Sequence, residues 1–173
     1  MSDVDGSPRT VAEALGQIVW LLSQSPVHKH LKIADLEWSI MPAVLTEQFR
    51  LFRFGPLPGL ENAKPEDFLP GFTKQGLEQM PLGLALWGNL SESAEAKVEA
   101  GERLVLEDWN SGDRLWLLEM ITPFATPENK LGEAMLADLL QGPFRGKRFH
   151  LHRTDPKTGR KDKVTLDGAA AAA

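Results

Sequence analysis

Two side chains in this sequence combine acid and base chemistry with positions that would hold them in place. His28 follows the break Ser25-Pro26 at the end of an apolar helical pattern, and imidazole is the side chain that titrates near neutral pH. Glu119 lies in the run RLWLLEMI, where two-residue alternation places it on a face with apolar residues. We expect this carboxylate to be paired or to have a raised pKa, because burial disfavours its charged form. Both groups are candidates for proton transfer, with a structural ion pair at Glu119 and a structural histidine at position 28 as the alternatives.

The four histidines form two His-x-His pairs, His28 with His30 and His150 with His152. If both pairs lay on strands, each would point to one face, and a four-histidine metal site is conceivable. Neither a carboxylate nor a cysteine pattern supports it. We therefore expect no metal, and we expect His150 and His152 to be exposed or to contact a partner. The chain has no cysteine, which excludes a thiolate nucleophile and a disulfide framework.

A strongly basic segment lies near the end of the sequence. Between Pro143 and Val164 there are eight basic residues and two acids, a local charge of plus 6 in a chain whose formal charge is minus 5. Clustered charge attracts and orients a partner of opposite sign. We expect this partner to be an acidic protein rather than nucleic acid. The rest of the chain is acidic and would repel phosphate groups, and within the basic segment only Phe144 and Phe149 could stack on bases. A solvated hairpin is the alternative. The candidate docking residues are Arg145, Lys147, Arg148, Lys157, Arg160 and Lys161.

The hydrophobic pattern predicts the elements that must position these residues. Thr10 and Glu13 form a capping box, and apolar residues at helical spacing follow as far as the break at Pro26. The predicted elements are a helix over 11–24, strands over 48–54 and 82–90, a helix over 91–104, a strand over 114–121, a helix between the cap Thr126 and Gly142, and a terminal hairpin over 147–166. Residues 27–45 stay undecided between helix and extended chain. Residues 55–80, rich in proline and glycine, form a long excursion that we interpret as a lid or a mobile segment.

This order of elements predicts an α+β fold with a mixed or antiparallel sheet flanked by helices. A chain of 173 residues is one domain by default, so we expect a single domain over 1–168, with Ala169–Ala173 as a disordered or artificial tail. Apolar residues make up 42% of the chain, with no run near the ~18 residues that a membrane span requires. The acidic start MSDVDGSPRT is unlike a secretory signal. Together with the absence of cysteine, it favours the cytoplasm.

Several segments resemble, in order and at compatible spacing, the signature blocks of the RTX toxin-activating lysine acyltransferases. They are LGQIVWLLSQSPVH (15–28), IMPA (40–43), LWGNLS (86–91), EDWNSGDRLWLLEMITPF (107–124) and RTDPKTGR (153–160). The resemblance covers most of residues 11–165. It implies an acetyltransferase-like fold of the GNAT superfamily, acyl carrier protein in place of coenzyme A as the donor, no tightly bound cofactor, an RTX-type toxin as the acceptor, and an assembly that resembles a homodimer.

The resemblance also implies site residues. The family's catalytic histidine matches His28, its catalytic aspartate falls on Glu119, which is one methylene longer, and a family asparagine falls on Ser39. On this basis His28 or Glu119 takes the proton of the attacking lysine, and a backbone N–H or the Ser39 hydroxyl stabilises the oxyanion. The basic segment would then bind acyl carrier protein, which is strongly acidic. The departures at positions 39 and 119 leave two other hypotheses open: a family member with altered or lost activity, and a non-enzymatic module that binds through the basic hairpin.

Overall fold

The computed structural model describes residues 10–53 and 80–168, together with Pro8, Lys64, Gly71, Thr73 and Gly76. Most of the excursion predicted over 55–80, and the tail Ala169–Ala173, lie outside the described residues. Within the part of the chain that is described, no helix has both the length and the apolar character needed to cross a membrane.

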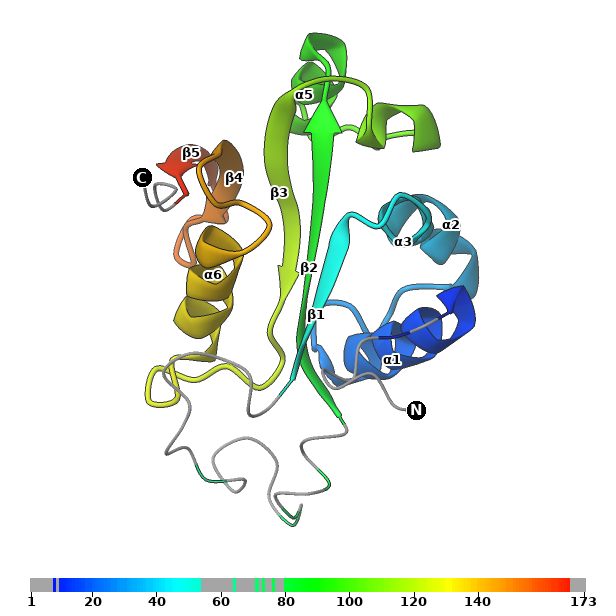
Figure 1. Ribbon diagram of the computed structural model, residues 1–173, viewed down its shortest axis with the longest axis vertical. Coiled ribbons are helices and arrows are strands. Elements are labelled where there is room, and N and C mark those ends of the chain that lie inside the picture. The colour runs from blue at the N-terminus through cyan, green and yellow to red at the C-terminus, as the bar shows by residue number, and fades with distance from the viewer. Residues whose placement is uncertain are drawn as a thin grey trace. The chain divides into compact units, whose positions relative to one another are not determined.

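Five strands form one mixed sheet in the order β1-β2-β3-β4-β5 (Figure 1). They are β1 (Phe49–Arg53), β2 (Pro81–Leu90), β3 (Arg114–Ile121), β4 (Arg148–Thr154) and β5 (Lys161–Asp167). Strands β3 and β4 are parallel, whereas β4 and β5 are antiparallel. The three predicted strands and the terminal hairpin are thus confirmed. The predicted α+β class with a mixed sheet is confirmed too, and it is consistent with the GNAT-like fold that the resemblance implies.

The helices are α1 (Val11–Gln24), α2 (Leu36–Ser39), α3 (Met41–Leu45), α5 (Glu92–Glu99) and α6 (Leu131–Gln141), with 3-10 turns η1 (Ile33–Asp35) and η3 (Leu106–Trp109). Helix α1 has the predicted bounds and cap, since Glu13 N donates to Thr10 Oγ1 at 3.1 Å. The undecided residues 27–45 form short helical pieces. One of them, α3, has Pro42 in its first turn, where a missing N–H costs nothing.

Helix α5 is shorter than the predicted helix over 91–104. It begins as expected, with Ala94 N donating to Ser91 Oγ at 3.2 Å. It ends at Glu99, and Gly101 follows with a left-handed φ of 74°. Glycine adopts this conformation without steric cost, so it stops a helix that the alanine and glutamate content would otherwise extend.

Helix α6 starts later than predicted, at Leu131 instead of next to Thr126. Residues 126–129 close a separate turn, in which Asn129 N donates to Thr126 Oγ1 at 3.1 Å and Thr126 N donates to Asn129 Oδ1 at 3.0 Å. Lys130 then takes a left-handed φ of 51°, which separates the turn from the helix. The predicted apolar stripe is nevertheless present, because Leu131 and Met135 are fully buried.

The chain divides into two compact units, and β1, β2 and β3 each contribute residues to both. The first unit comprises 1–31, 50–84 and 120–138, and the second comprises 32–49, 85–119 and 139–173. The single domain expected over 1–168 stays a prediction.

In the first unit, β1 is joined to two helices by arginine side chains. Arg53 Nη2 donates to Gln17 Oε1 of α1 at 2.5 Å, and Arg50 Nε lies 2.6 Å from Asp138 Oδ2 of α6. Met135 Sδ occupies the space that a Cβ at position 83 would need. Glycine at this point of β2 therefore lets α6 pack directly on the strand.

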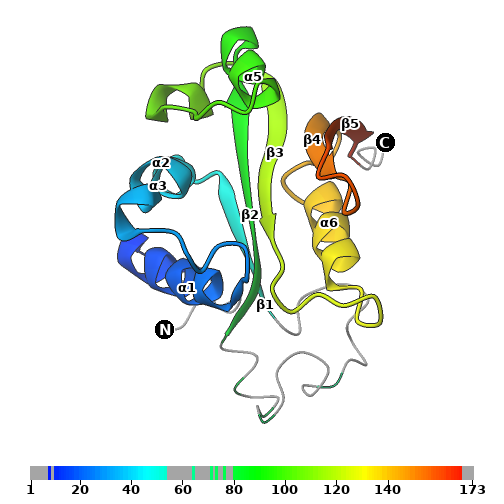
Figure 2. The ribbon, with the colours of Figure 1, turned by 180° about the vertical axis from the view of Figure 1, so that it is seen from behind.

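In the second unit, aromatic side chains form the core beside the hairpin β4–β5. The Phe144 ring lies 4.7 Å from the Phe149 ring and 5.4 Å from the Trp87 ring, measured between centroids. Helix α5 lies at the end where β2 finishes and β3 begins (Figure 2). Because α5 connects these two strands, its side chains can reach the start of β3.

Candidate functional site

His28 lies just beyond α1, in the first unit, on a turn of the chain built around Ser25. His28 N donates to Ser25 O at 3.1 Å, and Leu31 N donates to His28 O at 3.0 Å. The Ser25 hydroxyl, on a residue that is only 6% exposed, lies 2.7 Å from His28 Nδ1. This bond orients the half-buried imidazole. When Nδ1–H donates to Ser25 Oγ, the neutral ring keeps Nε2 as its basic nitrogen, so the turn holds His28 in a geometry suited to a base.

Ser39 is the last residue of α2, in the second unit, and its side chain is half-buried. Its Oγ donates to Asp35 O at 2.6 Å. The Asp35 carboxylate accepts from Lys32 N at 3.0 Å and from Trp38 Nε1 at 3.2 Å, and these bonds lower the pKa of Asp35. The hydroxyl proton of Ser39 is thus committed to a backbone carbonyl. To donate to an oxyanion, this side chain would have to rotate away from Asp35.

Glu119 is exposed on β3, so the prediction that its apolar face would bury it is wrong. Its neighbours on that face are buried, with Leu117 6% and Ile121 1% exposed. Of these three positions on the same face of β3, Glu119 is thus the one that other residues leave exposed. An exposed carboxylate keeps its hydration, so burial no longer selects Glu119 as a candidate. A catalytic role for Glu119 stays a prediction, which rests on the resemblance and on the exposure of its carboxylate.

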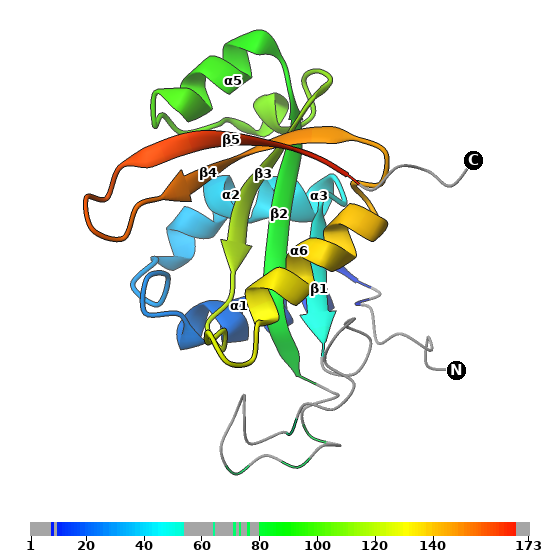
Figure 3. The ribbon, with the colours of Figure 1, turned by 90° about the vertical axis from the view of Figure 1, so that its left-hand side faces the viewer.

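Strands β3 and β4 pair only briefly. Their register joins Trp116 with His150 and Leu117 with Leu151. Strand β4 crosses β3 steeply, so the two separate beyond these pairs (Figure 3). Glu119 lies two residues beyond the pair Leu117 with Leu151, on the side of that pair where the two strands diverge.

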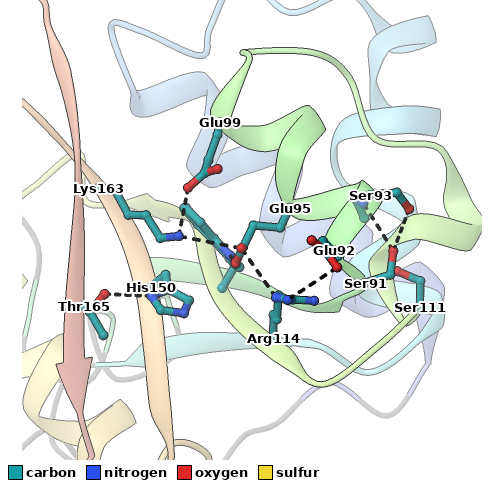
Figure 4. A network of polar contacts seen from close by, with 12 residues as sticks. Ser91, Glu92, Ser93, Glu95, Glu99, Ser111, Arg114, His150, Lys163 and Thr165 are labelled. Carbon is teal, nitrogen blue, oxygen red and sulfur yellow. Dashed lines mark hydrogen bonds and ion pairs between the residues drawn. The ribbon is translucent and has the colours of Figure 1, made fainter.

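A polar network lies in the second unit between α5 and the strands β3 to β5 (Figure 4). At its centre is the Glu95 carboxylate, whose side chain is 15% exposed and whose Oε2 accepts from Trp116 Nε1 at 2.7 Å. Glu95 Oε1 lies 3.5 Å from Arg114 Nε and 3.7 Å from Lys163 Nζ. Lys163 Nζ also donates to Glu99 Oε1 at 2.8 Å. No local sequence pattern indicates this network, because two of its contacts join residues that are 21 and 64 positions apart.

His150 and His152 are half-buried beside the same network. Of the two expectations for them, exposure is wrong, and contact with a partner stays a prediction. Their ring centroids lie 5.4 Å and 5.0 Å from that of Trp116, which is fully buried. Burial lowers the pKa of both imidazoles, and nearby lysine charges act in the same direction. The available signal was their His-x-His alternation, which puts both rings on one face. Among the described residues no group of three or more His, Asp or Glu side chains is placed to hold a metal ion.

In the signature block over 107–124, Asp108 is a buried carboxylate with a structural role. Asp108 Oδ2 accepts from Lys97 Nζ of α5 at 2.8 Å and from Val105 N at 2.9 Å. Burial opposes the charged form of Asp108, but these two bonds prevail, and its pKa is lowered overall. Asp108 therefore caps η3 and ties it to α5, which is a structural role.

The serine and glycine of the same block fix the end of β2. Ser111 Oγ accepts from Ser91 N at 2.9 Å, and the backbone N–H groups of Ser111 and Gly112 both donate to Asn89 O. A Cβ on Gly112 would lie 2.5 Å from Leu90 O, so only glycine fits there. These contacts hold the start of β3, and with it the backbone that carries Glu119.

The six candidate docking residues are all exposed and lie on both ends of the hairpin β4–β5. Two of them are paired within the hairpin, since Arg148 Nε lies 2.9 Å from Asp167 Oδ1 and Arg160 Nε lies 2.9 Å from Asp162 Oδ1. The other four have no ion pair within the described part of the chain; they are Arg145, Lys147, Lys157 and Lys161.

Comparison with known proteins gives consistent matches. A model of the RTX toxin acyltransferase family matches residues 7–59 and 72–166. The RTX-III toxin-activating lysine-acyltransferase of Actinobacillus pleuropneumoniae is 30% identical over 144 residues, which are 83% of this chain and 69% of that relative. A leukotoxin-activating lysine-acyltransferase of Aggregatibacter actinomycetemcomitans is 30% identical over 65% of this chain and 54% of its own length. A protein-lysine myristoyltransferase of Escherichia coli is 27% identical over 84% of this chain and 69% of its own length. The chain thus spans only part of each of these relatives.

Proposed function

The chain belongs to the RTX toxin acyltransferase family, and from that premise we propose that it transfers a fatty acyl group from acyl carrier protein to the ε-amine of lysines in an RTX-type toxin. The observation that carries this proposal is the family match, which includes His28, Ser39 and Glu119 within residues 7–59 and 72–166. The relatives are named as toxin-activating lysine acyltransferases or as protein-lysine myristoyltransferases. A chain of about fourteen carbons is therefore the first acyl group to test.

The reaction requires a base. A free lysine has a pKa of about 10.4, so its amine is almost wholly protonated at neutral pH and must lose a proton before it attacks. The neutral amine then adds to the thioester carbonyl, the C–N bond forms, the C–S bond breaks, and the thiol leaves with a proton. His28 is suited to take the lysine proton, because Ser25 orients its ring and histidine is the commonest general base in proteins.

We assign Glu119 a role at the substrate. Its exposure on β3 suits a carboxylate that meets an incoming lysine, which it can hold or deprotonate, better than one that stays buried as a neutral acid. Oxyanion stabilisation falls to a backbone N–H in this proposal, because the Ser39 hydroxyl donates to Asp35 O.

We further propose that the donor docks on the basic hairpin. Acyl carrier proteins are acidic, and the exposed lysines and arginines of the hairpin β4–β5 offer complementary charge. No tightly bound cofactor enters the proposed reaction, since the thioester arrives on its carrier. A cytoplasmic location and a homodimer remain predictions.

Co-expression with an RTX-type protein, followed by mass spectrometry of its lysines, tests the function. The wild-type chain is expected to add a fatty acyl mass. His28→Ala should lower the rate by about 10²- to 10⁴-fold, the usual effect of removing a positioned base, with an unchanged circular dichroism spectrum. His30→Ala is the matched control, because His30 is exposed and two residues away, and it should keep near wild-type activity. Near wild-type turnover by His28→Ala would refute the proposed base.

A second candidate is a family member whose activity is altered or lost. The Ser39 hydrogen bond to Asp35 O favours it, because the family asparagine at this position would offer an amide instead. Unmodified lysines after co-expression with the wild-type chain, together with a folded protein, would support this reading. Glu119→Gln with full activity would leave Glu119 only a structural part.

A further inference from the structure

The positive charges of the hairpin β4–β5 are not equally available. Lys163 is held by Glu99 and Glu95, Arg148 by Asp167 and Arg160 by Asp162. A cation that already has an ion pair gains less from a partner, because the new contact must replace the old one. The remaining basic residues of the hairpin are exposed and have no ion pair in the described part of the chain; they are Arg145, Lys147, Arg153, Lys157 and Lys161.

These five cations fall into two groups at opposite ends of the hairpin. Arg145 and Lys147 precede β4, whereas Arg153, Lys157 and Lys161 surround the turn that follows it. Strand β4 runs from Arg148 to Thr154, which at about 3.3 Å per residue separates the groups by about 20 Å. A small acidic surface would therefore engage one group at a time.

The direction of the strands shows which group lies on the side of Glu119. Strands β3 and β4 are parallel and share the pair Leu117 with Leu151. From that pair, Glu119 lies two residues further along β3, and Thr154, opposite Lys161, lies three residues further along β4. These steps correspond to about 7 Å along β3 and about 10 Å along β4, two strands that diverge from the shared pair. Arg145 and Lys147 lie the other way, toward the start of β3.

The turn group is also held rigidly. Asp155 Oδ1 accepts from Lys157 N at 2.7 Å, Asp155 O accepts from Gly159 N at 2.8 Å, and Asp155 N donates to Arg160 O at 2.8 Å. Gly159 supplies the left-handed φ of 70° that closes the turn. A fixed backbone reduces the entropy lost when a partner binds.

We propose that the turn end of the hairpin, with Arg153, Lys157 and Lys161, is the docking surface for the acidic carrier of the acyl donor, and that the Arg145 and Lys147 end is not. This inference rests on the proposed function. A carrier bound at the turn lies beyond the pair Leu117 with Leu151, as Glu119 does, so its thioester arm starts on the side of that pair where Glu119 is exposed. Residues 153–163 contain no aromatic side chain on which nucleic acid bases would stack.

Two double variants on the same hairpin test the proposal. K157E/K161E and R145E/K147E each reverse two exposed cations that have no ion pair with any described residue. The two variants therefore change the net charge equally. The probe is acyl carrier protein loaded with a fourteen-carbon chain, and its dissociation constant is measured by fluorescence anisotropy between 50 and 300 mM salt, roughly the range over which screening acts. K157E/K161E is expected to weaken binding by about tenfold or more and to reduce its salt dependence, whereas R145E/K147E should change it by less than about threefold.

An equal effect of both variants, or a larger effect of R145E/K147E, would overturn the assignment. So would a wild-type chain that binds no carrier, or a K157E/K161E variant that loses affinity for an RTX-type protein or for duplex DNA while keeping carrier binding. The proposed function is judged separately, by lysine acylation with the wild-type chain. If the wild-type chain acylates lysines but the two variants bind the carrier equally well, the docking surface is refuted and the proposed function stands.

Discussion

Among the carboxylates of the second unit, we expect Glu95 to be the one whose loss destabilises the fold most. Its Oε2 accepts from the indole of Trp116, a side chain with no exposed surface, and its Oε1 lies near two cations. We predict that Glu95→Ala lowers the free energy of unfolding by about 2–4 kcal/mol, the sum of the two contributions described next.

The larger contribution comes from the buried indole. Without Glu95, Trp116 Nε1 has no acceptor, and an unsatisfied buried donor costs about 1–3 kcal/mol. The ion pairs with Arg114 and Lys163 are longer than 3 Å and their cationic side chains are 38% and 35% exposed. Each should therefore contribute about 0.5 kcal/mol. Glu95→Gln keeps an acceptor for the indole and should cost only about 1 kcal/mol.

Urea denaturation, followed by tryptophan fluorescence, measures these differences. With a slope of about 1–3 kcal/mol per molar urea, the Glu95→Ala midpoint should fall by about 1 M or more. Glu92→Ala is the matched control from the same helix, since Glu92 is 87% exposed and lies 3.9 Å from Arg114; it should change stability by less than about 0.5 kcal/mol. Equal free energies of unfolding for Glu95→Ala and Glu92→Ala would refute the role assigned to the Glu95 bond with the indole. So would a Glu95→Gln variant that is as destabilised as Glu95→Ala.

Two further predictions concern pH and backbone packing. Burial lowers the pKa of His150 and His152 in the folded state. Below the ordinary histidine pKa of about 6.5, the unfolded chain therefore binds more protons than the folded one. The free energy of unfolding should be highest above that pH and should decrease as the pH falls through it. Denaturant titrations at pH 7.5 and 5.5 check this, and the decrease should shrink in His150→Asn/His152→Asn. Gly112→Ala should cost roughly 2 kcal/mol or more in thermal unfolding, because its Cβ would lie 2.5 Å from the fixed Leu90 O. Gly16→Ala should instead raise stability by about 0.5–1 kcal/mol, because no described atom outside its own stretch of helix lies within 4 Å of the new Cβ. Stability changes of the same sign for both variants would contradict this packing difference.

Local signals in the sequence predicted most elements correctly, because periodicity and capping act over a few residues. Helix α1 and the terminal hairpin agree with their patterns. The start of α6 was mistaken because Thr126 and Asn129 bond to each other and close a turn of their own. Alternation placed Glu119 correctly on a face with Leu117, but whether that face is covered depends on segments far away in sequence. The burial of His150 and His152 on Trp116 is likewise a product of packing between distant strands, and no local pattern contains it.

The structure divides the signature residues into those that hold the scaffold and those that remain for chemistry. Asp108, Ser111 and Gly112 fix the backbone before β3, so the match in that block speaks for the position of Glu119 rather than for its reactivity. A glutamate on this backbone places its carboxylate about 1.5 Å further out than an aspartate, the length of one C–C bond. Glu119 is exposed, so its carboxylate remains accessible to a substrate. The Ser39 hydroxyl, by contrast, is committed to Asp35 O. Of the two departures from the family pattern, the one at Ser39 therefore bears more directly on whether the site can stabilise an oxyanion.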